Sequence, residues 1–213
     1  MIDPEAERIA AAVCSRAGAK LISLPPAGEL IYDRQWLAED VATALLADLT
    51  SDLHWRQLPV RMFGRSVAQP RLTDFHGDRG TRYAYSGLRL SGRGWPPALA
   101  GLRAALGRQT GLNFNTVLCN LYRDGHDYMG WHADDEPELG RDPVIASLSL
   151  GAPRRFVLRP RAAGSGERCE LLLASGSLLI MSGDLQHYWQ HQLPKALRVD
   201  APRINLTFRQ VSA

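Results

Sequence analysis

The sequence is poor in cysteine and contains no long hydrophobic run, and both features limit the kinds of protein that fit. Three cysteines occur in 213 residues without the close spacing of a zinc site, so we expect reduced thiols in a cytoplasmic protein. Apolar stretches such as 178–181 fall far short of the roughly 20 residues that a membrane helix needs. Residues 1–16 lack the basic and then apolar layout of a secretory signal, so we expect neither export nor a membrane partner.

Internal repeats, low-complexity tracts and a strong charge imbalance are also missing. Hydrophobic residues make up 45% of the chain and charged residues 22%, which is close to globular averages. The net charge of +3 is compatible with a nucleic-acid partner but does not require one. The composition excludes disordered and fibrous proteins, and the length suits one folded domain, which we expect to be monomeric.

The order of the predicted elements favours an α+β fold. Apolar residues at helical spacing predict a helix over 34–50 with Asp33 as its N-cap, and Pro96 and Pro97 mark the start of a second helix that ends near Gly107 or Gly111. Short apolar or alternating runs then predict strands over 114–122, 144–150, 155–158, 170–173, 177–181 and 204–208. Many short strands after helices predict a double-stranded β-helix, or jelly roll, with N-terminal helices buttressing one face.

Three stretches organise this single domain. Residues 1–21 form an N-terminal extension that we expect to be loosely packed. Residues 22–112 supply the helical support and an arginine-, glycine- and aromatic-rich segment, residues 58–90, which we call the lid. Residues 113–213 are predicted to form the jelly-roll core.

An H-x-D pair carries the clearest chemical signal. His132 and Asp134 are two residues apart, so on a strand both side chains point to the same side. Two imidazoles and one carboxylate on one face of an octahedron form the facial triad of non-haem Fe(II) oxygenases. The third ligand is downstream, where both His187 and His191 are candidates that spacing alone does not separate. An isolated H-x-D pair also occurs as a surface salt bridge, so the motif needs support.

The run RINLTFRQ at 203–210 provides that support. On a strand its side chains alternate, with three apolar residues on one face and, on the other face, Arg203, Asn205, Thr207 and Arg209. Guanidinium groups pair with carboxylates through two hydrogen bonds, so two arginines facing a metal pocket predict a dicarboxylate co-substrate. The alternative is an exposed edge strand whose arginines face solvent.

These segments together resemble the AlkB-type Fe(II) and 2-oxoglutarate-dependent dioxygenases, which repair alkylated nucleic acids. The resemblance covers about residues 55–211 and is greatest to the duplex-acting AlkB homologues. It rests on N-L-Y at 120–122, H-x-D-D-E at 132–136, I-A-S-L-S-L-G at 145–151, G-S-L-L-I-M at 176–181, W-x-H-x-L-P at 189–194 and A-P-R-I-N-L-T-F-R at 201–209.

The resemblance implies roles at the matching positions. Iron would be held by His132, Asp134 and His191, and His187 would be a nearby structural residue. 2-Oxoglutarate would chelate the iron, O2 would take the remaining position, and the ends of the co-substrate would pair with the two arginines. The residues that the resemblance places at the co-substrate are Asn120, Tyr122, Arg203, Asn205, Thr207 and Arg209.

The resemblance also implies contacts to a base that has been flipped out of a duplex, because the pairing edge is otherwise out of reach. Tyr83 and Tyr85 would clasp that base against His132, although ordinary hairpin packing would also explain them. Phe63 falls where duplex-acting relatives fill the space left by the flipped base, and Arg71 matches a lid arginine near the lesion.

Two carboxylates directly after the iron motif complete the predicted substrate contacts. Asp135, and next to it Glu136, can meet the exocyclic amino group or the cationic ring of a methylated adenine or cytosine. The competing interpretation is that either one holds a lid arginine in place. The hairpin at 161–168 and the segment 195–198 look shorter or less basic than in strongly duplex-bound relatives, which keeps single strands open and leaves duplex DNA only slightly favoured.

We therefore expect direct reversal of N1-methyladenine and N3-methylcytosine in DNA, with Fe(II), 2-oxoglutarate and O2, releasing formaldehyde and succinate. One alternative is a 2-oxoglutarate-dependent demethylase of RNA, and another is a hydroxylase of a protein or small molecule on the same scaffold. A module that binds damaged bases without turnover is a further alternative, which the complete set of predicted ligands disfavours.

Overall fold

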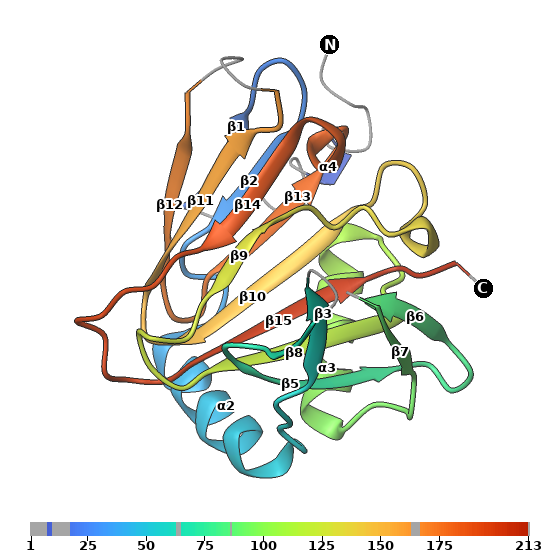
Figure 1. The fold of residues 1–213 in the computed structure, drawn as a ribbon, viewed down its shortest axis with the longest axis vertical. Helices are drawn as coiled ribbons and strands as arrows, with labels where there is room; N and C mark the ends of the chain where they lie inside the picture. The colour runs from blue at the N-terminus through green and yellow to red at the C-terminus, as the bar shows by residue number, and fades with distance from the viewer. Residues whose placement is uncertain (1–7, 10–17, 63–64, 86, 163–166, 213) are drawn as a thin grey trace.

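Two antiparallel sheets face each other in the computed structural model, which describes residues 8–9, 18–62, 65–85, 87–162 and 167–212 (Figure 1). The large sheet has seven strands in the order β1 (Ala19–Ser23), β2 (Glu29–Asp33), β13 (Leu178–Ser182), β10 (Ile145–Gly151), β15 (Arg203–Arg209), β8 (Thr116–Tyr122) and β5 (Leu72–Gly77). The small sheet has four, in the order β12 (Cys169–Leu173), β11 (Arg154–Pro160), β14 (Trp189–Leu193) and β9 (Met129–His132). This arrangement confirms the predicted jelly roll.

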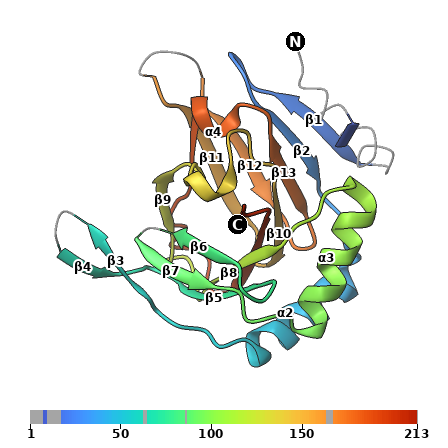
Figure 2. The ribbon, with the colours of Figure 1, turned by 90° about the vertical axis from the view of Figure 1, so that its right-hand side faces the viewer.

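The lid contributes two separate hairpins. One pairs β3 (Pro59–Met62) with β4 (Arg65–Ala68), and the other pairs β6 (Arg82–Tyr85) with β7 (Leu88–Ser91). Figure 2 shows both hairpins at the end of the molecule that carries β5.

Two 14-residue helices, α2 (Glu39–Asp52) and α3 (Pro97–Thr110), cover the outer face of the large sheet (Figure 2). Leu49 from α2 and Leu106 from α3 are buried in one cluster with Ile204, Leu206 and Phe208 from β15. Since strand side chains alternate, packing this apolar face against the helices turns the polar face of β15 toward the small sheet. None of the described helices is apolar over a length that would cross a bilayer.

A second apolar cluster lies between the sheets and holds them together. Phe156, Leu158 and Trp189 from the small sheet pack with Leu179 and Met181 from β13. The short helix α4 (Leu185–Tyr188) joins β13 to β14, and a 3-10 turn (Pro137–Leu139) follows β9. Polar residues occupy the rest of the space between the sheets, which is where the candidate site lies.

One predicted helix begins later than expected, and the other is confirmed. Asp33 ends β2 instead of capping a helix, because its Oδ1 accepts a hydrogen bond from the Gln35 backbone N–H at 2.9 Å and closes a turn. The helix therefore starts at Glu39, after Ala38, with no side-chain cap. The second helix starts at Pro97 as predicted and ends before Gly111, whose φ of 72° is the left-handed conformation that glycine adopts readily.

The structure describes only part of residues 1–21, which we expected to be loosely packed. Ile9 is fully buried in the cluster under the helices, and residues 19–21 belong to β1, which pairs with β2. Residues 1–7 and 10–17, which include Cys14, lie outside the described residues. The large sheet also takes strands from both sides of residue 112, so the boundary predicted there divides one sheet. Cys119 and Cys169 are free thiols.

Candidate metal and dicarboxylate site

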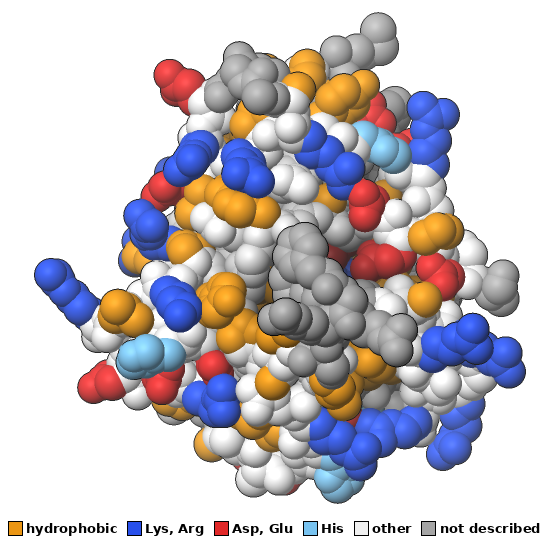
Figure 3. Space-filling model, in the orientation of Figure 1, with side chains coloured by type: hydrophobic (Ala, Val, Ile, Leu, Met, Phe, Trp, Pro, Cys, Tyr) orange, Lys and Arg blue, Asp and Glu red, His pale blue; other side chains and the backbone are white. Residues whose placement is uncertain are grey.

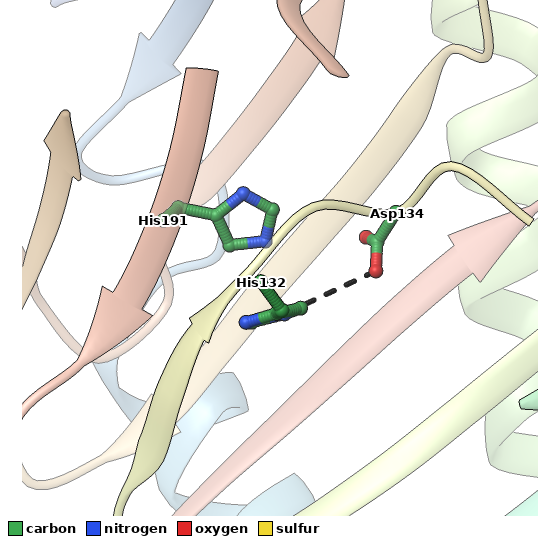
Figure 4. A group of neighbouring side chains, drawn as sticks. All are labelled: His132, Asp134 and His191. Carbon is green, nitrogen blue, oxygen red and sulfur yellow. Dashed lines mark ion pairs between the residues drawn. The ribbon is translucent and has the colours of Figure 1, made fainter. Parts of the chain in front are cut away.

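Three side chains with metal-ligating atoms meet between the two sheets. His132 ends β9, His191 lies directly opposite it on β14, and Asp134 follows two residues after His132. One ligand atom of each side chain lies within 4.8 Å of the ligand atoms of the other two, and the two imidazole centroids are 4.2 Å apart (Figure 4). His187, the other candidate, lies in α4 and donates Nε2–H toward Arg141 O at 2.6 Å. The structure therefore groups His191 with the H-x-D pair.

The protonation of both histidines suits metal binding. The His132 Nδ1 lies 2.9 Å from Gly130 O, and because a carbonyl only accepts, Nδ1 carries the proton and Nε2 keeps its lone pair. Burial lowers the pKa of His132, and burial, with the neighbouring His132, lowers the pKa of His191 to about 3. Both imidazoles are therefore neutral at pH 7, which is the form that binds a metal ion.

Asp134 is an ionised carboxylate with one oxygen left over. Its Oδ2 accepts a hydrogen bond from Arg209 Nη2 at 2.9 Å, and its backbone N–H donates to Gln186 Oε1 at 3.0 Å. Burial raises the pKa of Asp134, but the charge and hydrogen bond of Arg209, together with the neighbouring His191 and His132, outweigh that effect and lower the pKa to about 2. Oδ1 is buried and has no hydrogen-bond partner within the part of the chain that the structure describes. Two neutral imidazoles and an unsatisfied carboxylate oxygen are the donor set of a non-haem Fe(II) site.

The triad lines a pocket, which we call the central pocket, with a second cationic group in its wall. The Arg203 side chain donates Nη2–H to Ser149 Oγ at 2.9 Å and lies over the Tyr122 ring, 5.3 Å from its centroid. It is 2% exposed, its Nε has no hydrogen-bond partner, and it joins none of the ion pairs among the described residues. Burial lowers its pKa to about 10. A buried guanidinium without an acidic partner fits an anionic ligand.

All six residues predicted to contact the co-substrate line the central pocket. The Asn120 Oδ1 accepts a hydrogen bond from Arg71 Nε at 2.7 Å, so Arg71 belongs to this pocket too. Asn205 donates Nδ2–H to Ser147 Oγ at 2.8 Å and accepts from Thr207 Oγ1 at 3.0 Å. The side chains of Asn205 and Thr207 thus hold each other in place on the pocket wall.

The predicted substrate contacts are only partly described. Tyr83 is 1% exposed, stacks on Phe75 and donates its hydroxyl hydrogen to Glu136 Oε2 at 3.0 Å, which ties the lid to the segment after β9. Burial and the nearby Asp134 raise the pKa of Glu136. Phe63 and the side chain of Tyr85 lie outside the described residues.

The structure pairs Asp135 with a residue other than the lid arginine that the sequence analysis considered. Its exposed carboxylate forms an ion pair with Arg161, at the end of β11, and does not pair with an arginine of the lid within the described part of the chain. The Arg161 backbone N–H donates to Tyr188 O at 2.8 Å, which fixes that end of the strand. Asp135 therefore anchors Arg161 at the edge of the small sheet.

Two residues that support the site were not found from the sequence. Gln186 is 1% exposed and accepts a hydrogen bond from the Asp134 backbone N–H, so it fixes the backbone of this predicted ligand. Arg154 is also buried and donates hydrogen bonds to the carbonyl oxygens of Asp124, Asp127 and Pro194. Neither has a sequence signal, because each bonds to a segment far away in the chain.

Comparison with known proteins agrees with this geometry. Residues 29–209 match the family model described as "2OG-Fe(II) oxygenase superfamily". The chain is 40% identical over 209 residues to "Alpha-ketoglutarate-dependent dioxygenase alkB homolog 3" of Homo sapiens, covering 93% of this chain and 72% of that protein. It is 44% identical over 158 residues to "DNA oxidative demethylase ALKBH2" of Bos taurus, covering 71% of this chain and 57% of that protein.

A solved structure of OsALKBH1 superposes with a TM-score of 0.61 at 16% identity, covering 90% of this chain and all of that one. At this identity the likeness extends to the fold alone. It agrees with the jelly roll described above.

Proposed function

This chain belongs to the AlkB family of the 2OG-Fe(II) oxygenase superfamily, and we propose that it oxidatively demethylates N1-methyladenine and N3-methylcytosine in DNA. It is an Fe(II)- and 2-oxoglutarate-dependent dioxygenase. The observation that supports this substrate most directly is the link from Tyr83 in the lid to Glu136, two residues after the ligand Asp134. The relative from Bos taurus named as a DNA oxidative demethylase supports the same substrate class.

Different residues of the central pocket would hold Fe(II) and 2-oxoglutarate. His132, Asp134 and His191 would hold Fe(II), since each offers an atom that carries no proton at pH 7. Arg203 would pair with one carboxylate of 2-oxoglutarate and Arg209 with the other. Fe(II) and 2-oxoglutarate, bound together with O2, would supply the oxidation of a methyl C–H bond while 2-oxoglutarate is converted to succinate and CO2, and the resulting N-hydroxymethyl group would lose formaldehyde.

Several protein groups orient this chemistry without taking part in it. Gln186 fixes the backbone of Asp134, and the Gly130 carbonyl fixes the tautomer of His132. Arg209 neutralises the Asp134 oxygen that faces away from the metal-binding side, so Oδ1 stays available. Apolar Phe156 and Met181 also line the pocket and limit its access to water.

The substrate side suits a cationic base. N1-methyladenine and N3-methylcytosine carry a positive charge, and two carboxylates, Asp135 and Glu136, follow the iron motif. Tyr83 is buried against Phe75, and its hydroxyl holds the Glu136 carboxylate in place. A base flipped from a strand would be read by stacking and by hydrogen bonds to its pairing edge.

Mass-resolved turnover of methylated oligonucleotides tests the proposal. Single-stranded DNA, duplex DNA and RNA carrying N1-methyladenine are incubated with Fe(II), 2-oxoglutarate and ascorbate, beside the Asp134→Ala variant. The proposal predicts loss of one methyl group with formaldehyde release, absent from the variant. Activity on RNA alone would replace DNA as the substrate, and 2-oxoglutarate turnover with every oligonucleotide intact would point to a hydroxylase of another substrate.

A further inference from the structure

A second groove, of about 350 Å³, adjoins the central pocket at Leu118, which lines both. It lies between β5, β7 and residues 56–58, the stretch that leads into the first lid hairpin. The apolar residues that line it are Leu58, Phe75, Leu88, Leu90 and Leu118. Nothing in the iron or 2-oxoglutarate chemistry described above uses this groove.

Among the described residues that line this groove, the one acidic residue is already neutralised. Asp74 is 6% exposed, and its Oδ1 accepts a hydrogen bond from Arg93 Nη2 at 2.6 Å. Its Oδ2 accepts from the His54 backbone N–H at 3.0 Å and lies 2.9 Å from His76 Nε2. Arg93 and the hydrogen bonds from these neighbours already compensate the negative charge of the Asp74 carboxylate, so it would not neutralise a second arginine on the groove.

Two further arginines on the groove therefore remain available to an anion. Arg56 and Arg89 are exposed, and neither takes part in an ion pair among the residues that the structure describes. Figure 3 shows several Lys and Arg side chains on the part of this face where Figure 1 draws β5, β6 and β7. An apolar lining bordered by two unpaired guanidinium groups suits a ligand with a flat apolar part and a phosphate.

We propose that this groove binds the nucleotide next to the flipped base in the same nucleic-acid strand. Its base would contact Phe75 and the leucines, and its phosphate would pair with Arg56 and Arg89. The shared wall at Leu118 favours this occupant, because a strand whose flipped base enters the central pocket continues directly beside it. The inference rests on the proposed function for the identity of the strand.

Binding of an unmodified single strand tests the groove without requiring turnover. Fluorescence anisotropy with labelled pentathymidylate is measured from 0.05 to 0.5 M salt for the wild type and for the double variant Arg56→Gln/Arg89→Gln. The matched control is Arg34→Gln/Arg108→Gln, which removes two exposed arginines that do not line the groove. Thermal unfolding and 2-oxoglutarate binding verify that the variants are folded.

Each phosphate contact to a single strand contributes about 0.7 to the slope of log affinity against log salt. The groove variant is therefore expected to lose about 1.4 from that slope and to bind about 25-fold more weakly at 0.1 M salt, with the control unchanged. Equal slopes for the wild type and the groove variant, or an equal loss in the control, would overturn the assignment. If the groove variant shows the expected loss while the wild type demethylates no oligonucleotide, the groove stands and the proposed function fails.

Discussion

Replacing Arg203 by methionine is expected to separate co-substrate binding from stability. The guanidinium is 2% exposed, donates one hydrogen bond to Ser149 and pairs with no carboxylate among the described residues. Burial lowers its pKa from 12.5 to about 10. At 1.36 kcal/mol per pKa unit, the fold disfavours the charged form by about 3 kcal/mol.

The magnitude of the stability change follows from that difference. Methionine has a similar length and no charge, so Arg203→Met removes the cost of about 3 kcal/mol and loses one hydrogen bond worth about 1 kcal/mol. We expect the ligand-free variant to gain about 2 kcal/mol in its free energy of unfolding. For a chain of this size that raises the Tm by about 4–8 °C in calorimetry.

Co-substrate binding is expected to change in the opposite direction. Loss of one partner of a buried charge pair costs about 2–5 kcal/mol, so the affinity for 2-oxoglutarate should fall about 30- to 5,000-fold. Anaerobic titration calorimetry of the Mn(II)-loaded protein measures this affinity. The matched control is Arg154→Met, because Arg154 is equally buried but donates to three backbone carbonyl groups, and its loss should lower stability instead. A destabilised Arg203→Met protein that binds 2-oxoglutarate normally would refute the reasoning.

Three further changes probe the site. Asp134→Ala should abolish Mn(II) binding and lower the free energy of unfolding by about 3–5 kcal/mol, since Arg209 loses its buried partner. Calorimetric titration measures metal binding, and urea denaturation measures the stability. Metal binding retained by the variant would contradict the site. Burial lowers the pKa of His191 to about 3, so its contribution to the stability of the metal-free protein is complete above its ordinary pKa of 6.5 and falls as the pH drops toward 3. In urea titrations at several pH values, His191→Gln should show a weaker dependence of the free energy of unfolding on pH. The same pH dependence in the variant and the wild type would disprove this role of His191. Tyr83→Phe loses the hydrogen bond to Glu136 and should raise the KM for a methylated oligonucleotide about fivefold in steady-state assays. An equal rise in the KM for 2-oxoglutarate would show that Tyr83 does not act specifically on oligonucleotide binding.

Alternation along single strands made much of the core predictable. The apolar and polar faces of β15 are as the run RINLTFRQ indicated, because one face packs under the helices and the other enters the central pocket. The strands β1 and β2, only five residues each, were not predicted. Their place at the end of the large sheet depends on pairing with β13, which is far away in the sequence.

The spacing of residues in the sequence does not identify the third candidate metal ligand. Spacing left both His187 and His191 open, and the resemblance to a family was needed to favour one of them. The pairing of β14 with β9 favours His191 on physical grounds, since it sets His191 opposite His132 and leaves His187 on α4. Register between strands arises from tertiary contacts that a local pattern does not contain.

Hydrogen-bond partners were harder to predict than residue roles. Asp33 has the chemistry of an N-cap, but a turn at Gln35 uses its carboxylate first. Asp135 stays a predicted substrate contact, and the structure pairs it with Arg161, 26 residues farther along the chain. In both cases the residue type was informative and the partner was not predictable.

A crystal structure of this protein with Mn(II) and 2-oxoglutarate tests the central claim most directly. We expect one metal ion bonded to His132, Asp134 and His191 at about 2.1 Å, with a carboxylate of 2-oxoglutarate paired to Arg203. The competing location is the surface group formed by Asp142, Asp184 and His187, which also brings three ligand atoms within 4.8 Å of one another. Metal bound only there, or 2-oxoglutarate bound away from Arg203, would contradict the account.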